Sequence, residues 1–239
     1  MAAVSAWATT AAAHEPSEAA KQRMLDGGYL DYAWIGAEHM LTGYDHLLFL
    51  VGVLFFLTRP IDIVKFVSAF TVGHTITLLG ATLLSVKVNH YAIDAIIALT
   101  VIYKAFENLG GFQKTFRVRP PPLLLMVFVF GLIHGLGLSA RLQEMSMASE
   151  PGLVGRILTF NVGVELGQIA ALSLMALALA VWRGTPGWPQ VARAANLALI
   201  AGGVWLFALQ VYAFANQPPR ADLALTGETP PVTLSISEA

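Results

Sequence analysis

One segment, residues 34–57, constrains the fold of this chain more than any other. It is long enough to cross a bilayer as a helix and ends in an uninterrupted apolar run, yet it carries four ionisable side chains. These are Glu38, His39, Asp45 and His46. An ionisable group that faces hydrocarbon is costly, so such residues occur in membrane helices mainly where they face a partner, water or a bound ion. The segment therefore predicts a transmembrane helix with a functional polar face.

The composition agrees with a membrane protein. Of the 239 residues, 56% are hydrophobic and only 12% are charged, whereas about a quarter of the residues of soluble domains are charged. The net charge of −1 gives no reason to expect a nucleic acid partner, and the sequence has no phosphate-binding loop or dinucleotide-binding motif. Because there is no cysteine, any metal must be held by nitrogen and oxygen ligands.

Long apolar windows recur along the chain and predict an all-α, polytopic membrane protein, a bundle of about six transmembrane helices. The windows are 34–57, 62–85, 91–110, 121–141, 153–181 and 191–214. Glycine, proline and polar clusters separate them. We divide the chain into an N-terminal segment, a transmembrane domain and a polar C-terminal tail. Their bounds are 1–33, 34–214 and 215–239.

The N-terminal segment allows two interpretations. Ala11, Ala12 and Ala13 resemble a signal-peptide cleavage site, which would leave His14 as the first residue of the mature chain. No lysine or arginine precedes this site, so the alternative is an uncleaved end lying on the membrane. Loops one, three and five hold eight Lys and Arg residues and the opposite side holds six, which predicts that both termini lie outside the cytoplasm.

Four polar side chains fall at a common depth in their predicted helices. Counted at about 1.5 Å per residue, His46, His74, His134 and Glu165 all lie roughly 18 to 20 Å from a helix start, near the bilayer midplane. We interpret this layer as a cation or proton site. The alternative for a single histidine such as His74 is a hydrogen-bonding strut between helices.

Further polar residues adjoin this layer. Asp45 can supply a carboxylate or orient the His46 ring. His39 lies on the same helix face as His46, two turns away, and with Asp94 it marks an access path. Asn161 and Gln168 lie on one face of the fifth helix together with the layer's glutamate.

Two acidic residues of the third helix have competing interpretations. Glu107, next to Asn108, lies near the cytoplasmic end and is a candidate exit or proton-coupling carboxylate. The alternative for Asp94 and Glu107 is an interfacial salt bridge with Lys87 or Lys104. His14 and His90 are expected to be solvated.

The donor set limits the choice of metal. Imidazole and carboxylate without sulfur suit nickel, cobalt, zinc or copper(II) better than copper(I). The sequence does not distinguish among these ions, because geometry rather than ligand identity separates nickel from zinc.

Several sequence blocks, in order, resemble the HupE/UreJ family of nickel permeases and hydrogenase or urease accessory membrane proteins. The resemblance covers about residues 34–181. Its blocks are His39-x5-Asp45-His46, Phe70-Thr-Val-Gly-His74, Glu107-Asn108, Phe130-Gly-Leu-Ile-His134 and Phe160-Asn161-Val-Gly-Val-Glu165-Leu-Gly-Gln168.

The resemblance implies secondary transport of nickel or a similar divalent metal across a bacterial inner membrane. The metal-handling positions that it implies are His39, Asp45, His46, His134 and Glu165. The chain departs from the characterised permeases near the fourth helix, where they have two histidines and a following glutamate and only His134 is present here.

Two alternatives to a permease stay open. One is an accessory metal-binding subunit of a larger membrane complex, with other membrane subunits as partners. The other is an intramembrane zinc hydrolase, since three histidines and a carboxylate can activate water. The sequence lacks the S-x-x-x-H or H-x-x-x-H pair of ceramidase-like hydrolases, so we predict that the chain is not an enzyme.

Overall fold

The computed structural model describes residues 27–55, 57, 59–144 and 152–217, and all regular structure in these ranges is helical. The candidate cleavage site, His14 and the tail beyond Gln217 lie outside the described residues. The helices are α3 (Tyr29–Thr42), α4 (Tyr44–Leu54), α5 (Pro60–Leu83), α6 (His90–Asn108), the π-helix η2 (Phe112–Phe116), α7 (Leu123–Glu144), α8 (Leu153–Arg183) and α9 (Trp188–Ala215).

The all-helical prediction is confirmed and the apolar helices support a membrane protein, but the described residues contain four candidate membrane spans and not the six predicted. In the described part of the chain, four helices are long and apolar enough to cross a membrane: α5, α7, α8 and α9. The first predicted helix is divided into α3 and α4. The third predicted helix, α6, contains three charged side chains, Asp94, Lys104 and Glu107, which lower its hydropathy.

The division of the first predicted helix occurs at Gly43. This residue has φ −70° and ψ 111°, an extended conformation that ends α3 and also precedes α4 as its N-cap. A Cβ atom built on Gly43 would lie only 2.4 Å from His46 Nδ1. Glycine therefore lets the ring of His46 fold back over the break.

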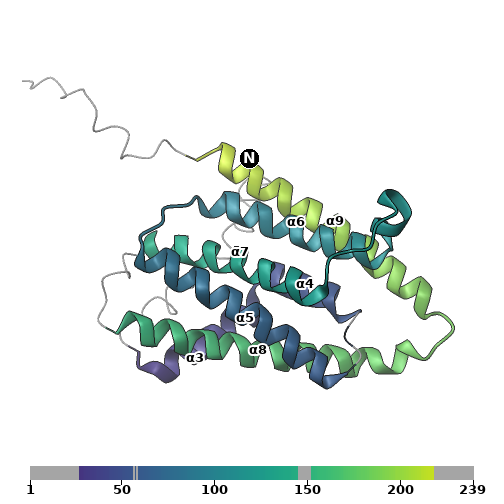
Figure 1. Ribbon diagram of the computed structural model, residues 1–239, viewed down its shortest axis with the longest axis horizontal. Coiled ribbons are helices and arrows are strands. Elements are labelled where there is room, and N and C mark those ends of the chain that lie inside the picture. Colours follow the sequence, from purple (N-terminus) through teal and green to yellow (C-terminus); the bar gives the residue numbers. More distant parts are fainter. Residues whose placement is uncertain (1–26, 56, 58, 145–151, 218–239) are drawn as a thin grey trace, which may run out of the picture.

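The helices lie side by side in the order that Figure 1 shows, with α6 and α9 along one edge, α3 and α8 along the other, and α5 and α7 between them. The most extensive contact is between α5 and α7. A Cβ atom on Gly131 of α7 would lie 2.2 Å from the Phe70 carbonyl oxygen, so the two backbones touch. This close approach brings α5 residues Phe70 and His74 to the level of His134.

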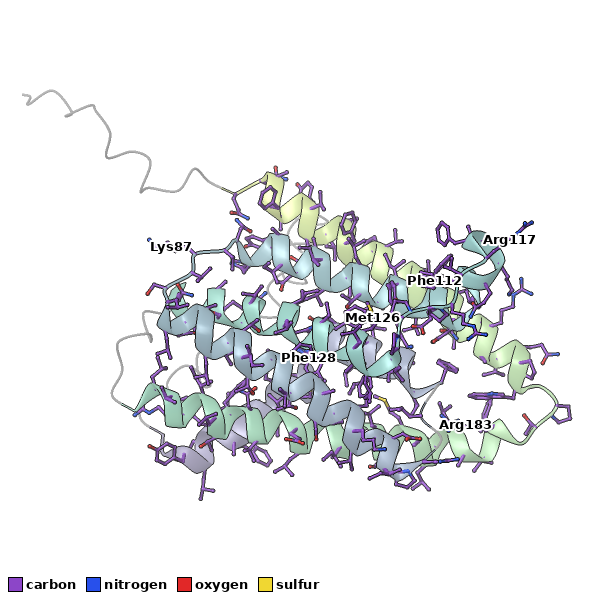
Figure 2. All side chains as sticks on the ribbon, in the orientation of Figure 1. Lys87, Phe112, Arg117, Met126, Phe128 and Arg183 are labelled. Atoms are coloured by element: carbon purple, nitrogen blue, oxygen red, sulfur yellow. The ribbon has the colours of Figure 1, made fainter. Side chains whose placement is uncertain are left out.

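α3 and α4 meet at Gly43 inside the bundle, whereas the connections on either side of α6 lie at opposite ends of it. Figure 2 places Lys87, between α5 and α6, at one end, and Arg117 and Arg183, which follow α6 and end α8, at the other. We call these the Lys87 end and the Arg117 end of the bundle.

Phenylalanine side chains fill the centre of the bundle. Phe49 of α4 contacts Phe66, Phe70 and Phe130, with ring centroids 6.1, 6.1 and 5.4 Å away. All four rings are buried. They form an apolar layer directly beside the polar residues described next.

Candidate metal centre

The structure brings together three buried polar side chains from two helices. Asp45 and His46 lie in the first turn of α4, and His134 lies in the middle of α7. Each offers one possible ligand atom, and these three atoms lie within 4.8 Å of one another. The His46 and His134 ring centroids are 5.2 Å apart. Two imidazoles and a carboxylate at this separation can bind one transition metal ion.

His39 adjoins this group from the opposite side of the helix break. It lies in the last turn of α3, and its ring centroid is 4.9 Å from that of His46. The two half-helices therefore meet at the cluster: the C-terminal end of α3 supplies His39, and the N-terminal end of α4 supplies Asp45 and His46. In a continuous helix, the seven residues from His39 to His46 would span two turns, and the three side chains would be spread along that length.

The hydrogen bonding of His134 fixes which ring nitrogen is available to an ion. Its Nδ1 atom lies 2.7 Å from the Phe130 carbonyl oxygen. A carbonyl only accepts, so Nδ1 carries the proton and donates it, and Nε2 carries the lone pair. Nε2 is buried and has no hydrogen-bond partner among the described residues. A histidine oriented through one nitrogen and open at the other is the usual arrangement of a metal ligand.

The Asp45 carboxylate is anchored at the start of α4 by two contacts. Its Oδ1 atom accepts a hydrogen bond of 2.8 Å from the backbone N–H of His46 and lies 3.0 Å from His46 Nδ1. The N-terminal end of α4 also places the positive pole of the helix dipole beside it. These contacts hold the carboxylate beside the His46 ring, within reach of the same ion.

A small cavity of about 20 Å³ opens between these residues. A buried water molecule needs roughly 10 to 15 Å³ of such space, so the cavity holds about one water-sized particle. Its lining residues are His39, Asp45, His46, Asp94, Ile97, His134, Gly137, Leu138 and Arg141. A single partly dehydrated metal ion fits this volume and this set of donors.

Arg141 and Asp94 form a buried ion pair in the wall of the cavity. Arg141 Nη2 lies 2.5 Å from Asp94 Oδ2, and both side chains are at most 10% exposed. The partner of Asp94 is thus Arg141 of α7 and not Lys87. With Asp45 included, two carboxylates and one guanidinium leave one net negative charge around the cavity when the imidazoles are neutral, which favours a cation.

Two residues of the predicted polar layer lie elsewhere. His74 Nδ1 is 2.7 Å from Asn161 Oδ1, and the ring stacks on Phe70, so this buried histidine links α5 to α8. Glu165 is partly buried and accepts a hydrogen bond of 2.9 Å from the Ser68 hydroxyl. The structure does not bring either residue into the group of Asp45, His46 and His134.

The other predicted polar residues are distributed as follows. Gln168 is fully buried and accepts a long, 3.5 Å hydrogen bond from the Thr71 hydroxyl. Glu107 forms an ion pair with Lys104, at 2.9 Å, on the same helix. His90 is the first residue of α6, partly exposed, with its ring against Tyr91.

Arg141 is the site residue that the sequence reasoning missed. It is the last residue of the apolar window 121–141, a position that suggests a charge at a helix end rather than in a site. Its spacing of seven from His134 places both residues on one face of α7, two turns apart, and this periodicity was the available signal.

The apolar helices and the buried histidine and aspartate cluster define a helical membrane protein with a candidate metal centre. The chain belongs to the HupE/UreJ family, since the family model described as HupE / UreJ protein matches residues 15–217. No curated protein and no solved structure matches the chain.

Proposed function

We propose that this protein is a permease for a divalent transition metal, with nickel or cobalt as the first candidates, and that the ion contacts Asp45, His46 and His134 during passage. The observation that supports the proposal most directly is the Nε2 lone pair of His134, buried without a partner beside a second imidazole and a carboxylate. Family membership supports metal transport or an accessory role rather than catalysis.

The donor chemistry supports ions of the nickel type. Imidazole nitrogen and carboxylate oxygen suit nickel, cobalt, zinc and copper(II), whereas copper(I) prefers sulfur. The sequence has no nucleotide-binding loop, so this chain would not power transport by hydrolysing ATP itself.

The divided first helix supports a transport role. Secondary transporters commonly bind their substrate where a transmembrane helix is broken, because the helix ends and unwound backbone contribute partial charges there. Here the break at Gly43 lies within the candidate site, with His39 on one side and Asp45 and His46 on the other. His39 and Asp94 line the part of the cavity toward the Lys87 end, which we assign as the access side.

The distribution of charge suggests the orientation. Loops at the Arg117 end are richer in lysine and arginine, which supports a cytoplasmic position for that end in a bacterial inner membrane and a periplasmic position for both termini. The ion would therefore enter from the Lys87 end and leave toward the Arg117 end.

Uptake of radioactive nickel by cells that express the protein tests the proposal. His134→Ala removes the buried lone pair and should lower uptake at low nickel concentration at least tenfold, with a matching loss of metal in the purified protein. His90→Ala, a partly exposed histidine at the start of α6, is the matched control and should transport normally. Unchanged uptake in His134→Ala would reject this site.

An accessory subunit of a larger complex is the second candidate, since the family also has this role. It is favoured if the protein purifies with a fixed set of membrane partners and neither cells nor vesicles containing it take up metal.

A further inference from the structure

A second buried polar cluster lies between α4, α6 and α9. Lys104 Nζ is 2.9 Å from Glu107 Oε2, and the Lys104 side chain is almost fully buried. The Asn108 amide donates hydrogen bonds to the Gly52 carbonyl oxygen, at 2.7 Å, and to Asn196 Oδ1, at 2.6 Å. An ion pair inside a membrane bundle is costly to desolvate, so its presence calls for a functional explanation.

Helix α4 connects this second cluster to the candidate metal centre. Its first turn carries Asp45 and His46, and its last turn carries Gly52, whose Cβ position would lie 3.3 Å from the Lys104 side chain. Gly52 follows His46 by six residues, or about 9 Å along the axis. On α6, Lys104 follows the cavity residue Asp94 by ten residues, or about 15 Å, toward the Arg117 end.

Aromatic rings separate the two clusters. Phe49 and Phe130 lie against the His134 side of the metal centre, with a Phe49 to His134 centroid distance of 5.9 Å. Tyr103, next to Lys104 in sequence, contacts Phe130 at 5.5 Å. An ion leaving His134 toward the Arg117 end meets this aromatic layer first and the Lys104 cluster next.

The second cluster contains oxygen atoms that lack a donor. Asn108 Oδ1 and the Tyr103 hydroxyl are buried without a hydrogen-bond partner among the described residues. Tyr103 and Glu107 are four residues apart, so they lie on one face of α6. Buried polar atoms are nearly always paired, and unpaired oxygens on the same turn of helix as a carboxylate suit a cation that is bound there during part of the cycle.

We propose that Glu107 and Asn108 form a second binding site for the transported divalent cation on its release path, and that the Lys104 ammonium group is a tethered cation that occupies this site between ions. This inference rests on the proposed transport function. A buried carboxylate needs a neutralising charge at every stage. As the ion arrives at Glu107, the Lys104 ammonium group releases a proton toward the cytoplasm and leaves the carboxylate as a neutral amine, and reprotonation of that amine restores the ion pair and expels the ion toward the cytoplasm.

A charge-free double variant tests the release role without leaving a lone buried charge. Lys104→Met with Glu107→Leu replaces the pair by apolar side chains, a change that is often neutral or stabilising in folded proteins. We expect the variant to bind one nickel ion per chain at the first centre, as the unmodified protein does, and to transport it at least tenfold more slowly in proteoliposomes. If the double variant is monodisperse and transports nickel as fast as the unmodified protein, the inference is overturned.

Thr82→Val is the matched control for this experiment. It removes another buried interhelical hydrogen bond, from Thr82 to Ser139, and neither residue lines the cavity or belongs to the Lys104 cluster. We expect it to leave binding and transport within about twofold.

A binding measurement tests the tethered cation itself. The background for this test is the double variant Asp45→Asn/His134→Ala, which lacks the first centre. Adding Lys104→Gln to it frees Glu107 to bind nickel. We expect titration calorimetry to show nickel binding at least tenfold tighter than in the background alone. Equal binding with and without Lys104→Gln would overturn the inference. If the double variant Asp45→Asn/His134→Ala binds nickel as tightly as the unmodified protein, the first centre is rejected, and the proposed function with it.

Discussion

Replacing Gly43 with alanine is the sharpest structural test of the metal centre. The backbone at Gly43 has φ −70° and ψ 111°, which alanine adopts without strain. The added Cβ, however, would lie 2.4 Å from His46 Nδ1 and 3.1 Å from Asp45 Oδ1. Because ordinary contact between such atoms begins near 3.4 Å, the ring of His46 must move by about 1 Å.

This displacement is large for a binding site and small for the fold. Metal and catalytic sites require their ligands within about 0.5 Å of the productive position. We therefore expect Gly43→Ala to weaken nickel binding at least tenfold in titration calorimetry. Since the atom that must move is at the end of a side chain, the free energy of unfolding should fall by no more than about 1 to 3 kcal/mol, the usual range for an overpacked site.

Gly80→Ala provides the control for this prediction. Gly80 lies in α5, where an added Cβ meets nothing within 4 Å, so alanine should stabilise the helix by about 0.5 to 1 kcal/mol and leave nickel binding unchanged. If Gly43→Ala binds nickel as tightly as the unmodified protein, His46 is not a ligand in the position described here, and the reasoning fails.

Three further predictions concern the surrounding contacts. Arg141→Gln leaves Asp94 buried without its partner and should destabilise the protein by about 3 to 5 kcal/mol in detergent melts, whereas the double change with Asp94→Asn should recover most of this loss. His74→Phe removes the hydrogen bond to Asn161 and should cost about 1 to 3 kcal/mol in the same melts, yet leave nickel affinity within about twofold; a tenfold loss would place His74 among the ligands. Removing metal with a chelator should lower the melting temperature, because nickel at a hundred times its dissociation constant contributes about 2.7 kcal/mol; equal melting with and without nickel would contradict a bound ion.

The helical class followed from the sequence because apolar windows long enough to span a membrane leave the backbone few other options. The motif His39-x5-Asp45-His46 likewise indicated where polar groups enter the first helix. The break inside that helix was not predicted, because Gly43 is tolerated in a continuous helix and only its neighbours decide whether the chain unwinds there.

The depth of a side chain in its helix and the direction in which it points explain why some predicted site residues lie in the cluster and others do not. The rise per residue predicts how deep a side chain lies, and it put His46, His74, His134 and Glu165 at one level. Which way each side chain points depends on the rotation of its helix, which is set by packing against other helices. Contact between the α5 and α7 backbones and the pairing of α5 with α8 turn His74 toward Asn161 and Glu165 toward Ser68.

Partner choice was also decided by the tertiary structure. The sequence offered Lys87 and Lys104 as partners for Asp94 and Glu107. Lys104 lies three residues from Glu107 on one helix, a local spacing that can be read from the chain. Arg141 reaches Asp94 from a different helix, 47 residues away in sequence, and only the packing of α6 against α7 determines that this pair closes the wall of the cavity at the candidate metal centre.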